Sequence, residues 1–139
     1  MKTSVPNEQM MALIKEAISH GQKATLKVVG TSMMPFFKDG LTEVTLAPAS
    51  DLQRLDVVLF QMQDKYYLHR IIKMDGMRVT AQGDYLFSKE EIDQTHIIAR
   101  VVSFLERGQS VDSRDIHYLR RVKRWHLIKP IILRLRRYR

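Results

Sequence analysis

The sequence contains no cysteine. This absence excludes a disulfide framework, a thiolate nucleophile, and any zinc or iron–sulfur site built on cysteine ligands. Long apolar runs are also missing, whereas a membrane-spanning helix needs about 20 consecutive apolar residues. The apolar stretch at residues 10–14 is too short and too closely flanked by charge for the core of a signal peptide. These absences predict a cytoplasmic protein without a transmembrane helix or signal peptide.

The sequence has enough residues for one globular domain. It is 139 residues long, 45% apolar and 27% charged, a composition typical of a packed domain rather than a disordered chain. Its net charge of +8 is unevenly distributed, because residues 114–139 hold ten basic residues and one acidic residue. Residues 1–113 hold 13 basic and 14 acidic residues. The pattern predicts a nearly neutral domain at 1–113 followed by a basic arm at 114–139.

The first part of the chain predicts one helix followed by short strands. Apolar residues recur at helical spacing over residues 7–20, with Asn7 as a candidate N-cap and Gly21 at the predicted end. Strand-like stretches follow at 25–29, 44–46, 56–61, 65–74, 77–81 and 96–105. Many short strands separated by turns favour a mainly β domain over residues 24–105.

The basic arm shows two apolar arcs on either side of Pro130, which predicts two short amphipathic helices rather than one long helix. Its partner could be an anionic membrane surface, the domain or another protein, or nucleic acid. Amphipathicity favours a membrane or a protein surface over nucleic acid. The residues expected to contact a membrane or a partner are Arg120, Arg121, Lys123, Arg124, Trp125, Arg134, Arg136 and Arg137.

Serine chemistry is the main candidate activity. Ser32 lies between Gly30, which permits unusual backbone angles, and Pro35, which restricts the residue before it. A serine nucleophile needs a base within hydrogen-bond reach and a group that orients the base. Of the five histidines, His69 is the best candidate because it lies in a predicted strand. The histidines are scattered and no cluster of carboxylates joins them, so we expect no metal site and no cofactor.

Four segments, in order, resemble the motif series of signal peptidase I, in the serine peptidase superfamily that includes LexA-type self-cleaving repressors. The segments are GTSMMP at 30–35, LDVVLF at 55–60, YLHRI at 67–71 and QGD at 82–84. The resemblance implies a compact, coiled β-sheet domain, to which this chain adds the N-terminal amphipathic helix and the basic helical C-terminal arm predicted from its residues. It implies Ser32 as the nucleophile, His69 as the general base and Asp84 as the accompanying acid. The remaining motif positions, expected to be structural, are Gly30, Met33, Pro35, Asp56, Arg70 and Gly83.

The activity implied by the resemblance is that of a serine endopeptidase. Its substrate would be an extended segment of a precursor protein or peptide, similar to a signal or leader peptide and bound as an added strand. Most bacterial signal peptidases have lysine where this chain has His69, and a neutral imidazole can accept a serine proton at neutral pH. The backbone N–H of Ser32 would be one oxyanion donor. Gly30 stands where many signal peptidases have a serine whose hydroxyl helps to hold the oxyanion, so a second donor must come from elsewhere.

Two other functions agree with the same residues. The chain could be a non-catalytic binding module that keeps a peptidase scaffold and docks through its basic arm. It could also be a LexA-like regulator, but only about 23 residues precede the β domain, too few for a helix-turn-helix unit. The presence of Ser32, His69 and Asp84 together favours the peptidase over the non-catalytic module.

Overall fold

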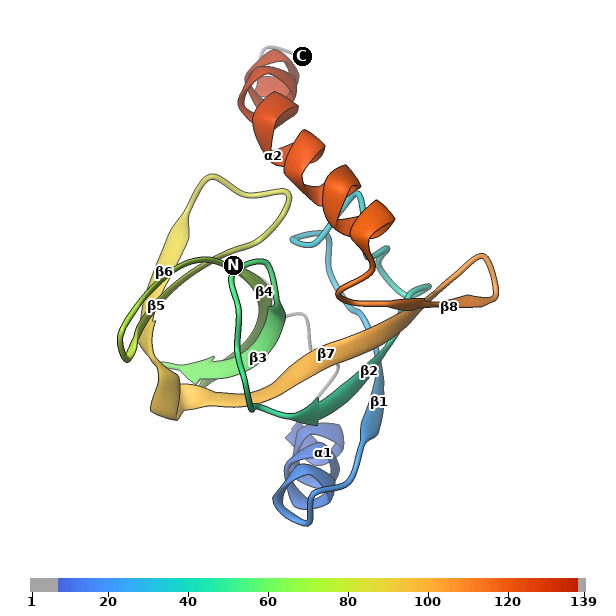
Figure 1. Cartoon of the computed structure of the whole chain (residues 1–139), viewed down its shortest axis with the longest axis vertical. Helices are drawn as coiled ribbons and strands as arrows, with labels where there is room; N and C mark the ends of the chain where they lie inside the picture. The colour runs from blue at the N-terminus through green and yellow to red at the C-terminus, as the bar shows by residue number, and fades with distance from the viewer. Residues whose placement is uncertain (1–7, 138–139) are drawn as a thin grey trace.

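The protein is built on one antiparallel sheet with a helix at either end of the chain. The computed structural model describes residues 8–137, and of Arg137 it describes the backbone alone. The elements follow the order α1 (Glu8–Ser19), β1 (Ala24–Lys27), β2 (Glu43–Pro48), β3 (Val57–Met62), β4 (Lys65–Asp75), β5 (Arg78–Gln82), β6 (Lys89–Asp93), a short 3₁₀ turn (Gln94–His96), β7 (Ile97–Glu106), β8 (Gln109–Asp112) and α2 (Ile116–Arg137). Figure 1 shows α1 and α2 at opposite ends of the sheet.

The eight strands form an open sheet in the order β1-β2-β7-β3-β4-β5-β6, with β8 paired to β7. The order places β7, a late strand, between β2 and β3. The mainly β fold with flanking helices is therefore confirmed. Neither α1 nor α2 is long and apolar enough, within the described residues, to cross a membrane.

Most predicted elements are present, with differences at their ends. The helix expected at 7–20 is α1, and it ends before Gly21, which has a φ of 73°. Its predicted cap, Asn7, lies outside the described residues. Strands β6 and β8 were not predicted from the sequence, although β6 carries Glu90, which contacts His69.

The sheet is buried on both faces around its central strand. On β3, Val57 and Leu59 belong to one apolar cluster, while Val58 and Phe60 belong to another. The first cluster includes residues of α1 and α2, and the second is formed by strands β3 to β7. A strand covered on both faces loses the alternation of polar and apolar residues, which explains the continuous apolar run of β3.

The prediction of two short helices at the C-terminus is wrong. Residues Ile116–Arg137 form one helix that contains Pro130. Proline removes one backbone hydrogen bond from a helix interior, but contacts with the domain hold the helix on both sides of it. Tyr118 and Val122 precede Pro130, Leu133 follows it, and all three are buried.

Candidate active site

Ser32 lies in the loop between β1 and β2, where local hydrogen bonds fix the backbone. Gly30, with a φ of 94°, donates its N–H to Asp39 Oδ1 at 2.8 Å. One turn further on, Phe37 donates its N–H to the carbonyl of Met33 at 2.9 Å, and both side chains are fully buried. The apolar anchors hold the turn against the core, and Ser32 itself is buried, with 8% of the residue exposed.

His69 lies on β4 and links two side chains from distant parts of the sequence. Its Nε2 is 3.2 Å from Ser32 Oγ, and its Nδ1 is 2.6 Å from Glu90 Oε1. A carboxylate oxygen only accepts, so the contact with Glu90 places the ring proton on Nδ1. Nε2 is then the acceptor that faces the Ser32 hydroxyl. The distance between Ser32 and His69 agrees with the predicted pair.

Glu90 is the functional candidate that sequence reasoning missed. It lies on β6 and pairs with Ala81 of β5, which in turn pairs with Ile71 of β4. Ile71 is two residues from His69 on β4, so the register brings Glu90 and His69 close together on one face of the sheet. Within β6, Glu90 and Ile92 are buried while the residues between and beside them are exposed. An acidic residue at a core-facing position of an alternating strand indicates a functional carboxylate. The sequence did not predict strand β6, so it did not identify Glu90 as such a residue.

Asp84 does not contact His69, so the predicted pairing of these two residues is corrected. Arg70 donates from Nε to Asp84 Oδ1 at 2.8 Å and from Nη2 to Oδ2 at 2.7 Å. His126 Nε2 lies 2.9 Å from the same Oδ1. Successive residues of a strand point to opposite faces, so Arg70 takes Asp84 to the face of β4 opposite His69.

The Arg70–Asp84 pair is fully buried and carries its charge. Burial by itself raises the pKa of Asp84, but Arg70 and His126 lower it by more, so the pKa lies below its usual value. Burial likewise lowers the pKa of Arg70, and Asp84 and Tyr118 reverse that effect and raise it above its ordinary value. Arg70 also donates to the Tyr118 hydroxyl at 2.7 Å. The pair therefore joins the sheet to α2.

Gly83 brings the Asp84 loop against the backbone of Ser32. Tyr85 donates its N–H to the Ser32 carbonyl at 2.9 Å. A Cβ atom added at Gly83 would lie 2.7 Å from that same carbonyl oxygen, closer than atoms can approach without a shift. Gly83 therefore has a structural role that agrees with its place among the motif residues.

The other motif residues are held in the framework. Asp56 forms an ion pair with Arg114, with Nη2 and Oδ2 2.9 Å apart, and accepts the N–H of Gln53 at 2.8 Å. These contacts connect the start of β3 to the segment before α2. Pro35 follows Met34 through a cis peptide bond.

The residues of the basic arm divide between the domain and the surface. Trp125 donates from Nε1 to the Asp84 carbonyl at 2.6 Å and stacks on Tyr85. It therefore lies on the side of the helix that packs on the domain, whereas the sequence predicted contact with a membrane or a partner. Arg121 forms an ion pair with Glu106 at 3.0 Å. Four other basic residues of the arm have exposed side chains: Arg120, Lys123, Arg124 and Arg134. Arg136 is also exposed, but its guanidinium lies over the Tyr85 ring, 5.6 Å from the ring centroid. The side chain of Arg137 lies outside the described part of the structure.

Among the described residues, no group of three His, Asp or Glu side chains is placed to hold a metal ion. The site therefore offers a hydroxyl, an imidazole and a carboxylate in one line. No model of a known protein family matches the chain, and no curated protein matches it.

Proposed function

We propose that the chain is a serine endopeptidase in which Ser32 is the nucleophile, His69 the general base and Glu90 the orienting acid. The observation that carries the proposal is the continuous line from Ser32 Oγ through both ring nitrogens of His69 to Glu90 Oε1. A serine, a base within reach and an acid on the far ring nitrogen are the three groups that acyl transfer requires.

In the proposed reaction, Ser32 Oγ attacks the carbonyl carbon of the scissile peptide bond while its proton passes to His69 Nε2. Glu90 stabilises the imidazolium that forms, because its carboxylate already accepts from Nδ1. The imidazolium then gives its proton to the leaving amine, the C–N bond breaks and an acyl-enzyme remains on Ser32. Water, deprotonated by His69, hydrolyses the acyl-enzyme and restores the serine. General-base catalysis of this kind contributes about 10²–10⁴ in rate.

The burial of the pair suits this chemistry. The His69 and Glu90 side chains are almost completely shielded from solvent, so the interaction between imidazolium and carboxylate is weakly screened. The rings of Phe60 and Tyr67 lie 6.1 and 5.7 Å from the imidazole and confine it. We further propose that the sheet is the coiled type expected from the resemblance to signal peptidase I, with substrate bound as an extended strand.

The test is covalent labelling with a fluorophosphonate probe, which reacts with activated serines. We expect Ser32→Ala to abolish labelling and His69→Ala to slow it by about 10²–10⁴. The matched controls are Ser110→Ala and His96→Ala, which change exposed residues outside the site and should label like the wild type. Equal labelling of the wild type and the Ser32→Ala variant would exclude the proposed nucleophile. A wild type that does not label would favour the non-catalytic binding module.

A further inference from the structure

Helix α2 uses one face for the domain and leaves the opposite face exposed. Tyr118, Val122 and Leu133 are buried, and the first two belong to the apolar cluster shared with α1 and the sheet. Leu127, Ile131 and Leu135, each four residues apart, are 80%, 63% and 66% exposed. Residues four apart lie on one face of a helix, so the outer face carries an apolar row along its C-terminal half. The solvent-facing side of a surface helix is ordinarily polar, and an exposed apolar patch indicates an interaction site.

Basic residues surround this row, which we call the outer row and define as Leu127, Ile131 and Leu135. Lys123 and Arg124 lie about one turn before the outer row, and Arg134 precedes its last member, Leu135. All three basic side chains are exposed. Residues 116–137 contain no aspartate or glutamate. The surface therefore combines exposed apolar side chains with uncompensated positive charge.

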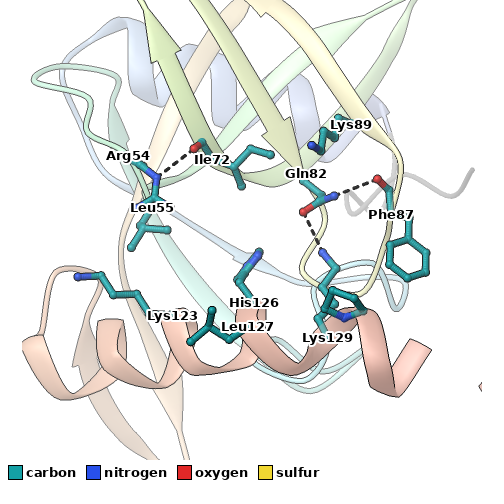
Figure 2. Close-up of a pocket in the computed structure, with 11 residues that line it drawn as sticks. Arg54, Leu55, Ile72, Gln82, Phe87, Lys89, Lys123, His126, Leu127 and Lys129 are labelled. Carbon is teal, nitrogen blue, oxygen red and sulfur yellow. Dashed lines mark hydrogen bonds between the residues drawn. The ribbon is translucent and has the colours of Figure 1, made fainter. Parts of the chain in front are cut away.

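An open pocket of about 760 Å³ lies beside the outer row. Figure 2 shows α2 forming one wall and the sheet the other, with Leu127 at the helix wall. Its basic lining residues are Arg54, Lys89, Lys123, His126 and Lys129, and no residue that lines it is acidic. Phe87 and Pro130 add apolar surface to the lining. The pocket is therefore suited to a phosphate group attached to an apolar body.

We propose that this surface docks on a bilayer that contains anionic phospholipids. The outer row enters the boundary between headgroups and acyl chains, Lys123, Arg124 and Arg134 attract the anionic surface, and the pocket takes a headgroup phosphate. A second copy of the chain fits less well, because it would bring the same positive charges against the row. Nucleic acid would meet the cations but leave the apolar row exposed to water.

The test is sedimentation of the full chain with phosphatidylcholine vesicles that contain or lack phosphatidylserine. We expect binding only to the anionic vesicles, and less of it at about 0.5 M salt. The variant Leu127→Ser/Ile131→Ser should bind at least tenfold more weakly, since two apolar side chains no longer enter the bilayer. Its control is Leu13→Ser on α1, which is also 66% exposed but lies at the other end of the molecule (Figure 1).

The charge is tested with Lys123→Gln/Arg124→Gln, which should weaken binding about 25-fold, because each basic residue near an anionic surface contributes about fivefold. The matched control, Lys23→Gln/Lys27→Gln, changes two exposed lysines near β1 and should bind like the wild type. Equal effects of the outer-row variants and their controls, binding to neutral vesicles alone, or no binding would overturn the proposal. The proposal would also be overturned if the chain formed a dimer through this surface, or bound added RNA, instead of binding the vesicles. The Ser32→Ala variant should bind vesicles normally, so this proposal and the peptidase proposal can fail separately.

Discussion

Two buried carboxylates lie close to the candidate site, and their partners give them different tasks. Glu90 accepts from the imidazole that faces Ser32, whereas Asp84 neutralises a buried guanidinium. A carboxylate on a catalytic base should affect the reaction, while one that neutralises a buried cation should affect stability. The two roles can be separated with isosteric amide variants.

The first prediction concerns Glu90→Gln. An amide cannot stabilise an imidazolium as a carboxylate does, so we expect labelling of Ser32 to slow by about 10²–10⁴. The measurement is the second-order labelling rate over a range of pH, together with the thermal midpoint. The control is Glu91→Gln, an exposed neighbour on the other face of the same strand. Unchanged labelling of Glu90→Gln would show that this carboxylate does not orient the base.

The second prediction concerns Asp84→Asn, which leaves the charge of Arg70 buried without its partner. We expect the free energy of unfolding to fall by about 3–5 kcal/mol, measured by chemical denaturation. Because the pKa of Asp84 is lowered in the folded state, its stabilisation is complete above the ordinary pKa of about 4 and is lost only as pH falls below that. The titration of Asp84 itself should therefore add no pH dependence to this loss across neutral pH. An equally small loss in Asp84→Asn and in Asp75→Asn, an exposed control, would contradict this role.

At the scale of elements, α2 is bound to the loop that supports Ser32. Trp125 and His126 contact Asp84, and Lys129 donates to the Gly83 carbonyl at 3.1 Å and to Gln82 Oε1 at 2.9 Å. The same loop contacts the Ser32 carbonyl through Tyr85 and Gly83. The helix therefore helps to position Ser32, the proposed nucleophile, from the opposite side of the loop.

The third prediction uses Lys129, which is almost completely buried. Burial lowers the pKa of Lys129 from 10.5 to about 8, and Lys89 and Arg70 also lower it while Asp84 opposes them. Below pH 8 Lys129 is protonated in both the folded and the unfolded state, so the folded state bears the full free-energy cost of burying its charge. Above pH 8 the folded state loses its proton first, so the unfolded state binds more protons and stability rises with pH.

We therefore expect the free energy of unfolding of the wild type to rise by about 2 kcal/mol relative to that of Lys129→Met between pH 7 and pH 9.5, because the lowered pKa links proton binding to stability. Denaturation of both proteins at the two pH values gives this difference. Lys123→Met, which changes an exposed lysine on the same helix, should show no such dependence on pH. A constant difference between wild type and Lys129→Met would mean that Lys129 titrates normally.

At the scale of the whole molecule, α2 is part of the main core rather than an appendage. Tyr118 and Val122 share an apolar cluster with Phe37, Phe104 and residues of α1. Tyr118 contacts Phe36 and Phe104 at ring distances of 5.7 and 4.8 Å. The basic segment thus completes the core that the sheet and α1 begin.

The fourth prediction is that a chain ending at residue 115 loses most of its stability. Each of the buried side chains Tyr118, Val122 and Leu133 contributes about 1.5–3 kcal/mol, which together approach the total stability of a typical domain. Circular dichroism and urea denaturation of the shortened chain measure the loss. A chain ending at residue 133 keeps the packed face and should remain near wild type. Full stability of the shorter chain would show that α2 is separable from the domain.

The sequence by itself predicted the helix α1, most of the strands and the mainly β class, and the resemblance of its motifs to those of signal peptidase I predicted the pair formed by Ser32 and His69. These features depend on local patterns: apolar spacing, turn residues and short motifs around Gly30 and His69. The sequence also located the excess positive charge in residues 114–139.

Only the tertiary structure decided which acid meets the base and what the basic segment does. Glu90 reaches His69 because β4, β5 and β6 are neighbours in the sheet. The two residues are 21 positions apart in the sequence, and no local pattern predicts the register of strands over that separation. Asp84 is drawn to Arg70 because alternation along β4 turns Arg70 and His69 to opposite faces. Packing against the sheet likewise keeps α2 continuous through Pro130 and determines which of its apolar residues remain exposed.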